Sequence, residues 1–336
     1  MTTACTITLG ISLLLYLAAT LLFQGNLLLH RGRWDGWGRG ALLAGIVVHS
    51  FGMVMHFTFS GKPILSNMLV VISLLTIVLL AATLLAERYA GVRHLSLLAA
   101  PLAFFALLYA LLMPIRFDEA ESVLLRYPWL GIHVFLSLLG YIGFALAFCA
   151  AVAYLAQSRA LKRGRLNRYL PPLNSAAGVT YHSAAIGFSL FTLGLIMGVI
   201  WLLGAPGDYL EPRDTKIWMA VPTWLAFAAY LYRRGVSGQQ SSRLKWLVIV
   251  GFLLALINLL GVRHDFEEPV QGLDQLLRSE VGLRVGGEED RRRRDPERIV
   301  EFSVPVKLRR FSGCFCLRNA IVRIFNYFKL CNLSLW

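Results

Sequence analysis

Residues 127–141 read YPWLGIHVFLSLLGY and open an apolar run that continues to about residue 157. A helix needs about 20 apolar residues to cross a bilayer, and a spanning segment must satisfy its own backbone polar groups. The run therefore predicts a transmembrane helix that begins near Trp129. His133 would lie roughly 6 Å inside the outer boundary of that helix, where an imidazole needs an explanation.

The chain as a whole is too apolar for a soluble domain. Of its 336 residues, 57% are hydrophobic, and the mean hydropathy is +0.61. We predict an all-α, polytopic membrane protein with about eight transmembrane helices. The expected spans are about 5–23, 40–60, 65–86, 94–114, 129–157, 181–204, 215–232 and 243–262. The first has no charged segment before it and no small-residue cleavage site, so we expect a retained helix rather than a signal peptide.

Basic residues mark alternate loops between these spans. Lys and Arg gather at 24–39, 158–180 and 233–245, whereas 115–128 and 205–214 carry more acidic than basic residues. An excess of Lys and Arg marks the cytoplasmic side. We therefore predict a multi-pass protein of a bacterial-type inner (cytoplasmic) membrane, with both termini and loop 6 (205–214) outside. We attribute the net charge of +14 to these basic loops, which orient the chain in the lipid bilayer, and not to a nucleic-acid site.

The character of the chain changes after the last span. Residues 1–262 form the predicted transmembrane domain, and residues 263–336 form a charged linker followed by a basic, aromatic C-terminal tail. The linker contains GGEEDRRRRDPER, a block typical of a solvated segment. The tail would either lie on the membrane surface as an amphipathic helix or form a poorly packed appendage.

Familiar catalytic patterns are missing from the sequence. The five cysteines form no C-x-x-C pair, and there is no G-x-x-x-x-G-K, G-x-S-x-G or H-E-x-x-H motif. Thiol–disulfide chemistry, a nucleotide-driven pump and a common hydrolase are therefore not indicated. No acid–base pair or nucleophile constellation predicts an enzyme.

Two histidines lie inside the second span. His49 and His56 are seven residues apart and share one helix face. An ionisable residue at such depth indicates either a functional site or a neutral imidazole that is hydrogen-bonded to a neighbouring helix. We interpret His30, His94 and His182 as ordinary loop or interface residues.

Two further histidines fall at the predicted outer boundary. His133 opens the fifth span and His264 follows the eighth, so both can flank loop 6. The aromatic residues around that loop are Trp201, Tyr209, Trp218 and Trp224. This arrangement suits haem, because its iron takes axial imidazoles and its porphyrin packs on aromatic rings. An interfacial belt of aromatic residues would give the same composition.

Three segments carry a resemblance to a known family. WLGIHVFLSLLGYIGFALAFCAAVAYL (129–155), AIGFSLFTLGLIMGVIW (185–201) and RDTKIWMAVPTWLAFAAYLYRR (213–234) resemble, in order, the motifs of the cytochrome c assembly family, CcsA or ResC. In that family haem crosses the membrane and is presented outside for attachment to apocytochrome c. A tryptophan-rich external loop packs on the haem, and external histidines supply axial ligands.

The resemblance implies specific roles for residues of this chain. His133 matches the first external histidine and His264, more loosely, the second, so both would bind the iron. Transiently bound haem is the implied cofactor, with Asp214 and the tryptophans at its rim. Other cytochrome c assembly proteins or apocytochrome c are the implied partners.

Two departures leave alternatives open. Loop 6 has no tryptophan between Trp201 and Trp218, and Tyr232 stands where the family has a membrane histidine. Both departures resemble the short eight-span HemX and YpjD type. The alternatives are a HemX-like regulatory or scaffold protein of haem biosynthesis without bound haem, and a small-molecule transporter.

Overall fold

Eight helices make up the part of the chain that the computed structural model describes, namely residues 3–29, 33–60, 68–112, 128–164, 167–204, 215–238 and 241–261. They are α1 (Thr3–Leu29), α2 (Arg33–Ser60), α3 (Met68–Tyr89), α4 (Ser96–Leu112), α6 (Pro128–Lys162), α7 (Leu173–Gly204), α8 (Thr215–Ser237) and α9 (Ser242–Gly261). No strand occurs within these ranges. The prediction of an all-α, polytopic membrane protein is confirmed.

Length and composition distinguish six of the helices. The helices long and apolar enough to cross a membrane are α1, α2, α3, α6, α7 and α9. The apolar helix α4 has only 17 residues. Helix α8 carries Arg233 and Arg234 among its aromatic residues, which lowers its mean hydropathy. Each of the eight predicted spans nevertheless corresponds to one helix.

Several helices extend beyond the predicted spans, so the connections between them are shorter than expected. Helix α2 begins at Arg33 instead of residue 40, α6 continues to Lys162 instead of 157, and α7 begins at Leu173 instead of 181. The added turns are polar and would leave the hydrocarbon region. Asp35 in the first turn of α2 and Lys162 in the last turn of α6 each complement the helix dipole.

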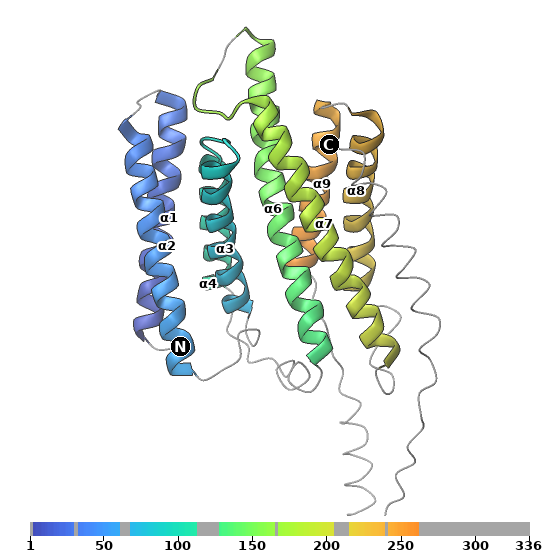
Figure 1. Ribbon diagram of the computed structural model, residues 1–336. Helices are drawn as coiled ribbons and strands as arrows, with labels where there is room; N and C mark the ends of the chain where they lie inside the picture. Colours follow the sequence, from blue (N-terminus) through green and yellow to red (C-terminus); the bar gives the residue numbers. More distant parts are fainter. Residues whose placement is uncertain are drawn as a thin grey trace, which may run out of the picture. The chain divides into compact units, whose positions relative to one another are not determined.

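Successive helices run up and down the bundle, so its two ends differ (Figure 1). The His94 end holds the start of α2, the turn between α3 and α4, and residues 163–172. The His133 end holds the start of α6, the end of α7 and the start of α8. Helices α1 and α2 pack as one pair and α6 and α7 as another, with α3 and α4 contacting α6.

Basic residues are distributed unequally between these ends. At the His133 end, the first turn of α8 contains Lys216. Among the described residues, the only acidic ones are Asp35 and Glu87, and both lie at the His94 end. The His94 end carries Arg33, Arg39, Arg88, Arg93, Arg159, Lys162, Arg163, Arg168, Arg233, Arg234, Arg243 and Lys245. This asymmetry agrees with a cytoplasmic His94 end. The orientation stays a prediction.

Glycines allow α6 and α7 to approach almost to backbone contact. A Cβ added at Gly143 would lie 2.6 Å from the Cα of Gly187, and one added at Gly140 would lie 2.8 Å from the Cβ of Phe191. Small residues permit such close packing of membrane helices. Phe144 stacks on Phe227 of α8, with 3.7 Å between ring centroids. The glycine contacts fix the register in which α6 presents His133 to α7.

Candidate functional site

His133 is oriented by the backbone of the neighbouring helix. Its Nδ1 lies 2.6 Å from the carbonyl oxygen of Gly194. A carbonyl only accepts hydrogen bonds, so Nδ1 carries the proton that is donated. In the neutral ring the lone pair then lies on Nε2, the nitrogen that can bind a metal. A metal-bound histidine commonly uses its other nitrogen in this way.

The face of α7 that receives the imidazole is made of glycine. A Cβ at Gly198 would lie 2.7 Å from Nδ1 of His133 and 2.8 Å from its Cε1, so any larger residue would displace the ring. Trp201 is seven residues beyond Gly194 and therefore lies on the same face of α7. Its side chain is partly buried. The structure thus brings His133 and Trp201 to one end of one helix pair.

The other two described tryptophans of the predicted site occupy different environments. Trp224 donates from Nε1 to the Thr192 hydroxyl at 2.9 Å and packs on Phe188, with ring centroids 5.2 Å apart. Trp224 therefore packs between α7 and α8, farther from the end of the bundle than His133. Trp218 lies one turn into α8 and is 66% exposed. Asp214, Tyr209, His264 and the tail 263–336 lie outside the described residues.

His49 belongs to a separate part of the bundle. It is fully buried, and its Nδ1 lies 3.1 Å from the hydroxyl of Tyr16 on α1. Helix α2 packs mainly on α1 and α3, whereas α6 packs on α3, α4, α7 and α9. The contact with Tyr16 matches the interpretation of an imidazole bonded to a neighbouring helix. His49 and His133 are not brought together.

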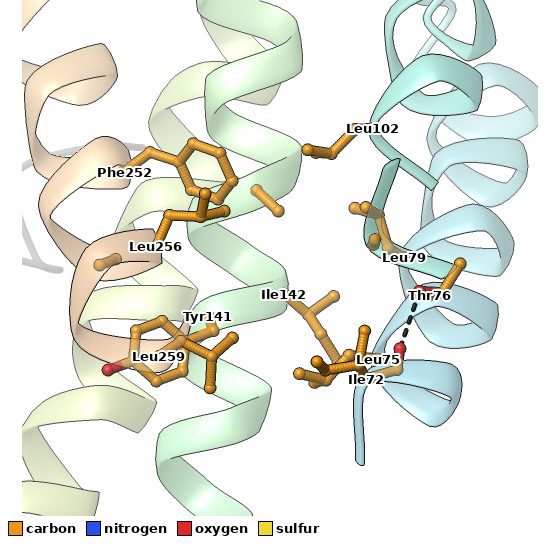
Figure 2. Close-up of a pocket in the computed structure, with 13 residues that line it drawn as sticks. Ile72, Leu75, Thr76, Leu79, Leu102, Tyr141, Ile142, Phe252, Leu256 and Leu259 are labelled. Carbon is orange, nitrogen blue, oxygen red and sulfur yellow. Dashed lines mark hydrogen bonds between the residues drawn. The ribbon is translucent and has the colours of Figure 1, made fainter. Parts of the chain in front are cut away.

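An apolar pocket lies between the two halves of the bundle, lined by α3, α4, α6 and α9 (Figure 2). Its side chains include Leu79, Leu102, Phe252 and Leu256. The lining oxygens are already engaged: the hydroxyl of Thr76 donates to the carbonyl of Ile72, and that of Tyr141 accepts from Asn258. The pocket therefore offers packing surface but no imidazole, thiolate or carboxylate for iron.

Two polar features were missed from the sequence, both near the His94 end. His94 was interpreted as an ordinary loop residue, yet its Nδ1 lies 3.1 Å from Oδ1 of Asp35. Lys245 belongs to the basic segment 233–245 that marks the predicted cytoplasmic side, yet its side chain is buried against Tyr154 and Tyr230. Both depend on contacts between distant helices, and no local pattern indicates them.

Comparison with known proteins gives a consistent family. Residues 47–267 match the family model described as cytochrome C assembly protein. Three similar relatives are cytochrome c biogenesis proteins CcsA. The one from Chlamydomonas reinhardtii is 29% identical over 184 residues, which are 54% of this chain and 50% of that protein. The one from Guillardia theta is 26% identical over 246 residues, 67% of this chain and 81% of that protein.

The third relative, from Synechococcus elongatus, is 28% identical over 231 residues, 55% of this chain and 71% of that protein. This chain thus spans half the length of the relative from Chlamydomonas reinhardtii and a larger share of the other two relatives. No solved structure matches the chain. The range matched by the family model includes His133, Trp201 and every helix from α3 to α9.

Proposed function

Because the chain belongs to the cytochrome c assembly protein family, we propose that it acts in cytochrome c biogenesis and holds haem at the His133 end of the bundle. In this proposal that end faces the outside of a bacterial-type inner membrane. The haem is cargo, presented there to apocytochrome c or to another assembly protein. The observation that carries the proposal is the imidazole of His133, which donates from Nδ1 to Gly194 at 2.6 Å.

The described residues have complementary tasks in this site. His133 offers the lone pair of Nε2 to the iron, and an imidazole nitrogen is a strong ligand for it. The glycine face of α7 holds the ring in one orientation before haem arrives. Trp201 supplies an aromatic surface at the same end of α7, and Trp218 is exposed one helix further on. Haem bound here would supply the iron and the vinyl groups for attachment to cysteine thiols.

Three residues of the predicted site keep their roles as proposals. His264 is the proposed second axial ligand, Asp214 belongs to the proposed rim of the haem, and Trp224, which bonds Thr192 across the contact between α7 and α8, is kept as a proposed aromatic neighbour of the haem. His49 remains a candidate for a separate membrane site because of its full burial.

A HemX-like role without bound haem is the second candidate. It is favoured by Tyr232, which stands where the family has a membrane histidine and is 71% exposed on α8. In that role the basic residues of the His94 end would contact a protein partner. A small-molecule transporter gains no support from the described helices.

The decisive experiment is an absorption spectrum of protein purified in mild detergent from haem-replete cells. Wild-type protein should show a Soret band and sharp low-spin bands. His133→Ala should lose the low-spin bands, and added imidazole should partly restore them, because it replaces the missing ligand. His182→Ala is the matched control. His182 also lies on the bundle surface of α7, where its Nδ1 bonds the carbonyl of Gly178 at 2.8 Å.

Two outcomes would contradict the proposal. Wild-type protein without a Soret band would favour the HemX-like role. A Soret band that His133→Ala leaves unchanged would place the haem elsewhere, and His49→Ala would then be the next variant to measure. Equal loss of haem from His133→Ala and His182→Ala would indicate general instability rather than a lost ligand.

A further inference from the structure

Cations and one tryptophan gather where α6 ends and α9 begins, at the His94 end of the bundle. The guanidinium of Arg159 on α6 lies 6.0 Å from the ring centroid of Trp246 on α9. Beside this contact, the hydroxyls of Ser158 and Ser242 are 3.3 Å apart. The two helices are therefore joined here, and the contact between Arg159 and Trp246 belongs to their outer surface, because both residues are exposed.

Helix periodicity adds two more cations to this surface. Lys162 follows Arg159 by three residues on α6, and Arg243 precedes Trp246 by three residues on α9, so each pair shares a helix face. Lys162 and Arg243 are both exposed. We name Arg159, Lys162, Arg243 and Trp246 together the Trp246 face. Its three positive charges repel one another unless an anion lies between them.

No carboxylate of the described residues neutralises these charges. The described ranges contain only Asp35 and Glu87, and both are bonded within a network of α2, α3 and α4. A further charge lies beneath the surface, because the ammonium of Lys245 is buried 5.0 Å from the ring centroid of Tyr154 on α6. A buried charge is screened less than an exposed one, so it adds to the positive potential of the Trp246 face. This potential attracts an anion from outside the described part of the chain.

An apolar stripe runs along α9 from this face toward the middle of the bilayer. Val250, Leu253 and Ile257 follow Trp246 at intervals of four, three and four residues, so all of them lie on one side of α9. Their exposed fractions are 48%, 48% and 50%. The rise from Trp246 to Ile257 is roughly 16 Å. Because tryptophan favours the headgroup level of a bilayer, the stripe extends from the headgroups into the hydrocarbon. A ligand that matches both parts has an anionic head and an apolar chain.

We propose that the Trp246 face is a binding site for one anionic phospholipid. The phosphate lies among Arg159, Lys162 and Arg243, whose cationic groups donate charge-assisted hydrogen bonds to its oxygens. An acyl chain lies along the stripe from Val250 to Ile257. Inorganic phosphate makes only the first of these contacts, and a zwitterionic lipid carries its own ammonium beside the phosphate, so neither fits the face as well. Basic sites between transmembrane helices on the cytoplasmic side bind lipid headgroups in this way. Haem at the His133 end is not needed for this binding.

The test counts the phospholipids bound to the full chain by native mass spectrometry in detergent. The protein is titrated with phosphatidylglycerol and, separately, with phosphatidylcholine that has the same acyl chains. Wild-type protein should bind one phosphatidylglycerol in preference to phosphatidylcholine. The double variant Arg159→Gln, Arg243→Gln should bind phosphatidylglycerol roughly 25-fold more weakly, because each cation contributes about fivefold. Its affinity for phosphatidylcholine should not change.

A matched control and a stability measurement accompany this variant. Arg88→Gln with Arg93→Gln removes two exposed arginines of the same end of the bundle, away from Trp246, and should change neither affinity. Without lipid, the Arg159→Gln, Arg243→Gln variant should unfold at the wild-type temperature, since it removes only exposed charges. Added phosphatidylglycerol should raise the unfolding temperature of wild-type protein more than that of the variant.

Several results would overturn the proposed lipid site. Equal binding of phosphatidylglycerol and phosphatidylcholine to wild-type protein would show that charge does not select the ligand. An equal loss of binding in the Arg88 and Arg93 control would assign it to the general charge of this end and not to the Trp246 face. Displacement of the lipid by inorganic phosphate, or by glycerophosphoglycerol without acyl chains, would make the occupant a free anion. Unchanged lipid binding by the Arg159→Gln, Arg243→Gln variant, together with a lower unfolding temperature, would leave these cations a purely structural role.

Discussion

Gly198→Ala tests whether the packing of α7, and not only the presence of an imidazole, determines the site. The added Cβ would lie 2.7 Å from Nδ1 and 2.8 Å from Cε1 of His133. These atoms must therefore separate by several tenths of an ångström. The shift acts directly on the 2.6 Å hydrogen bond from Nδ1 to Gly194. His133 would remain in the protein but would point elsewhere.

The expected change in the free energy of unfolding combines two costs and one gain. Overpacking a well-packed contact costs about 1–3 kcal/mol, and the lost hydrogen bond costs about 0.5–1.5 kcal/mol. Replacing a helical glycine by alanine stabilises the helix by about 1 kcal/mol. The free energy of unfolding should therefore fall by roughly 0.5–3.5 kcal/mol, the sum of those effects. The low-spin bands should weaken or vanish, because an axial ligand must be held within about 0.5 Å of its working position.

Gly178→Ala provides a control on the same helix. A Cβ at Gly178 meets no atom within 4 Å, so only the gain in helix propensity remains. This variant should be as stable as wild-type protein or slightly more stable, with an unchanged spectrum. The measurements are thermal unfolding in detergent and haem content per protein. If Gly198→Ala matches Gly178→Ala in both, the close approach of α7 to His133 does not control the ligand, and the reasoning fails.

Two further predictions concern orientation and a buried charge. Reporter fusions after residues 165 and 210 should report opposite sides of the membrane, and the same side for both would refute the topology. Tyr230→Phe should destabilise the protein by about 1–3 kcal/mol, because it removes the hydroxyl that accepts from the buried ammonium of Lys245. Lys245→Met should be neutral or stabilising in the same thermal unfolding assay, since it removes the buried charge itself; the reverse order would contradict this account.

The helices could be predicted from the sequence because bilayer thickness sets their length. Each apolar run of about 20 residues became one helix, including the less hydrophobic α8. Boundaries such as Arg33 and Leu173 were missed, because hydropathy detects the hydrocarbon-facing turns and not the polar turns that extend a helix beyond them. His133 was singled out from its sequence motif. Its acceptor was not, because the contact with Gly194 depends on how α6 and α7 are rotated against each other.

The histidines show which part of a site the sequence leaves open. His182, His133 and His94 all donate from Nδ1 to an oxygen. The acceptor of His182 is the carbonyl four residues earlier in its own helix, which is within reach of any helical histidine and fixes nothing in the tertiary structure. The acceptor of His133 is 61 residues away on another helix, and that of His94 is a carboxylate 59 residues away.

Only a long-range acceptor orients an imidazole relative to the rest of the fold. Such a ring is ordered before a ligand arrives, so less conformational entropy is lost on binding. His133 and His94 satisfy this condition, and the ring of His94 also meets that of Tyr169 edge to face. His182 shares the tautomer but lacks the tertiary constraint. If replacing His182 removed haem as effectively as replacing His133, without lowering the unfolding temperature, then ring orientation would not be what selects the ligand, and the haem site at His133 would lose its physical basis.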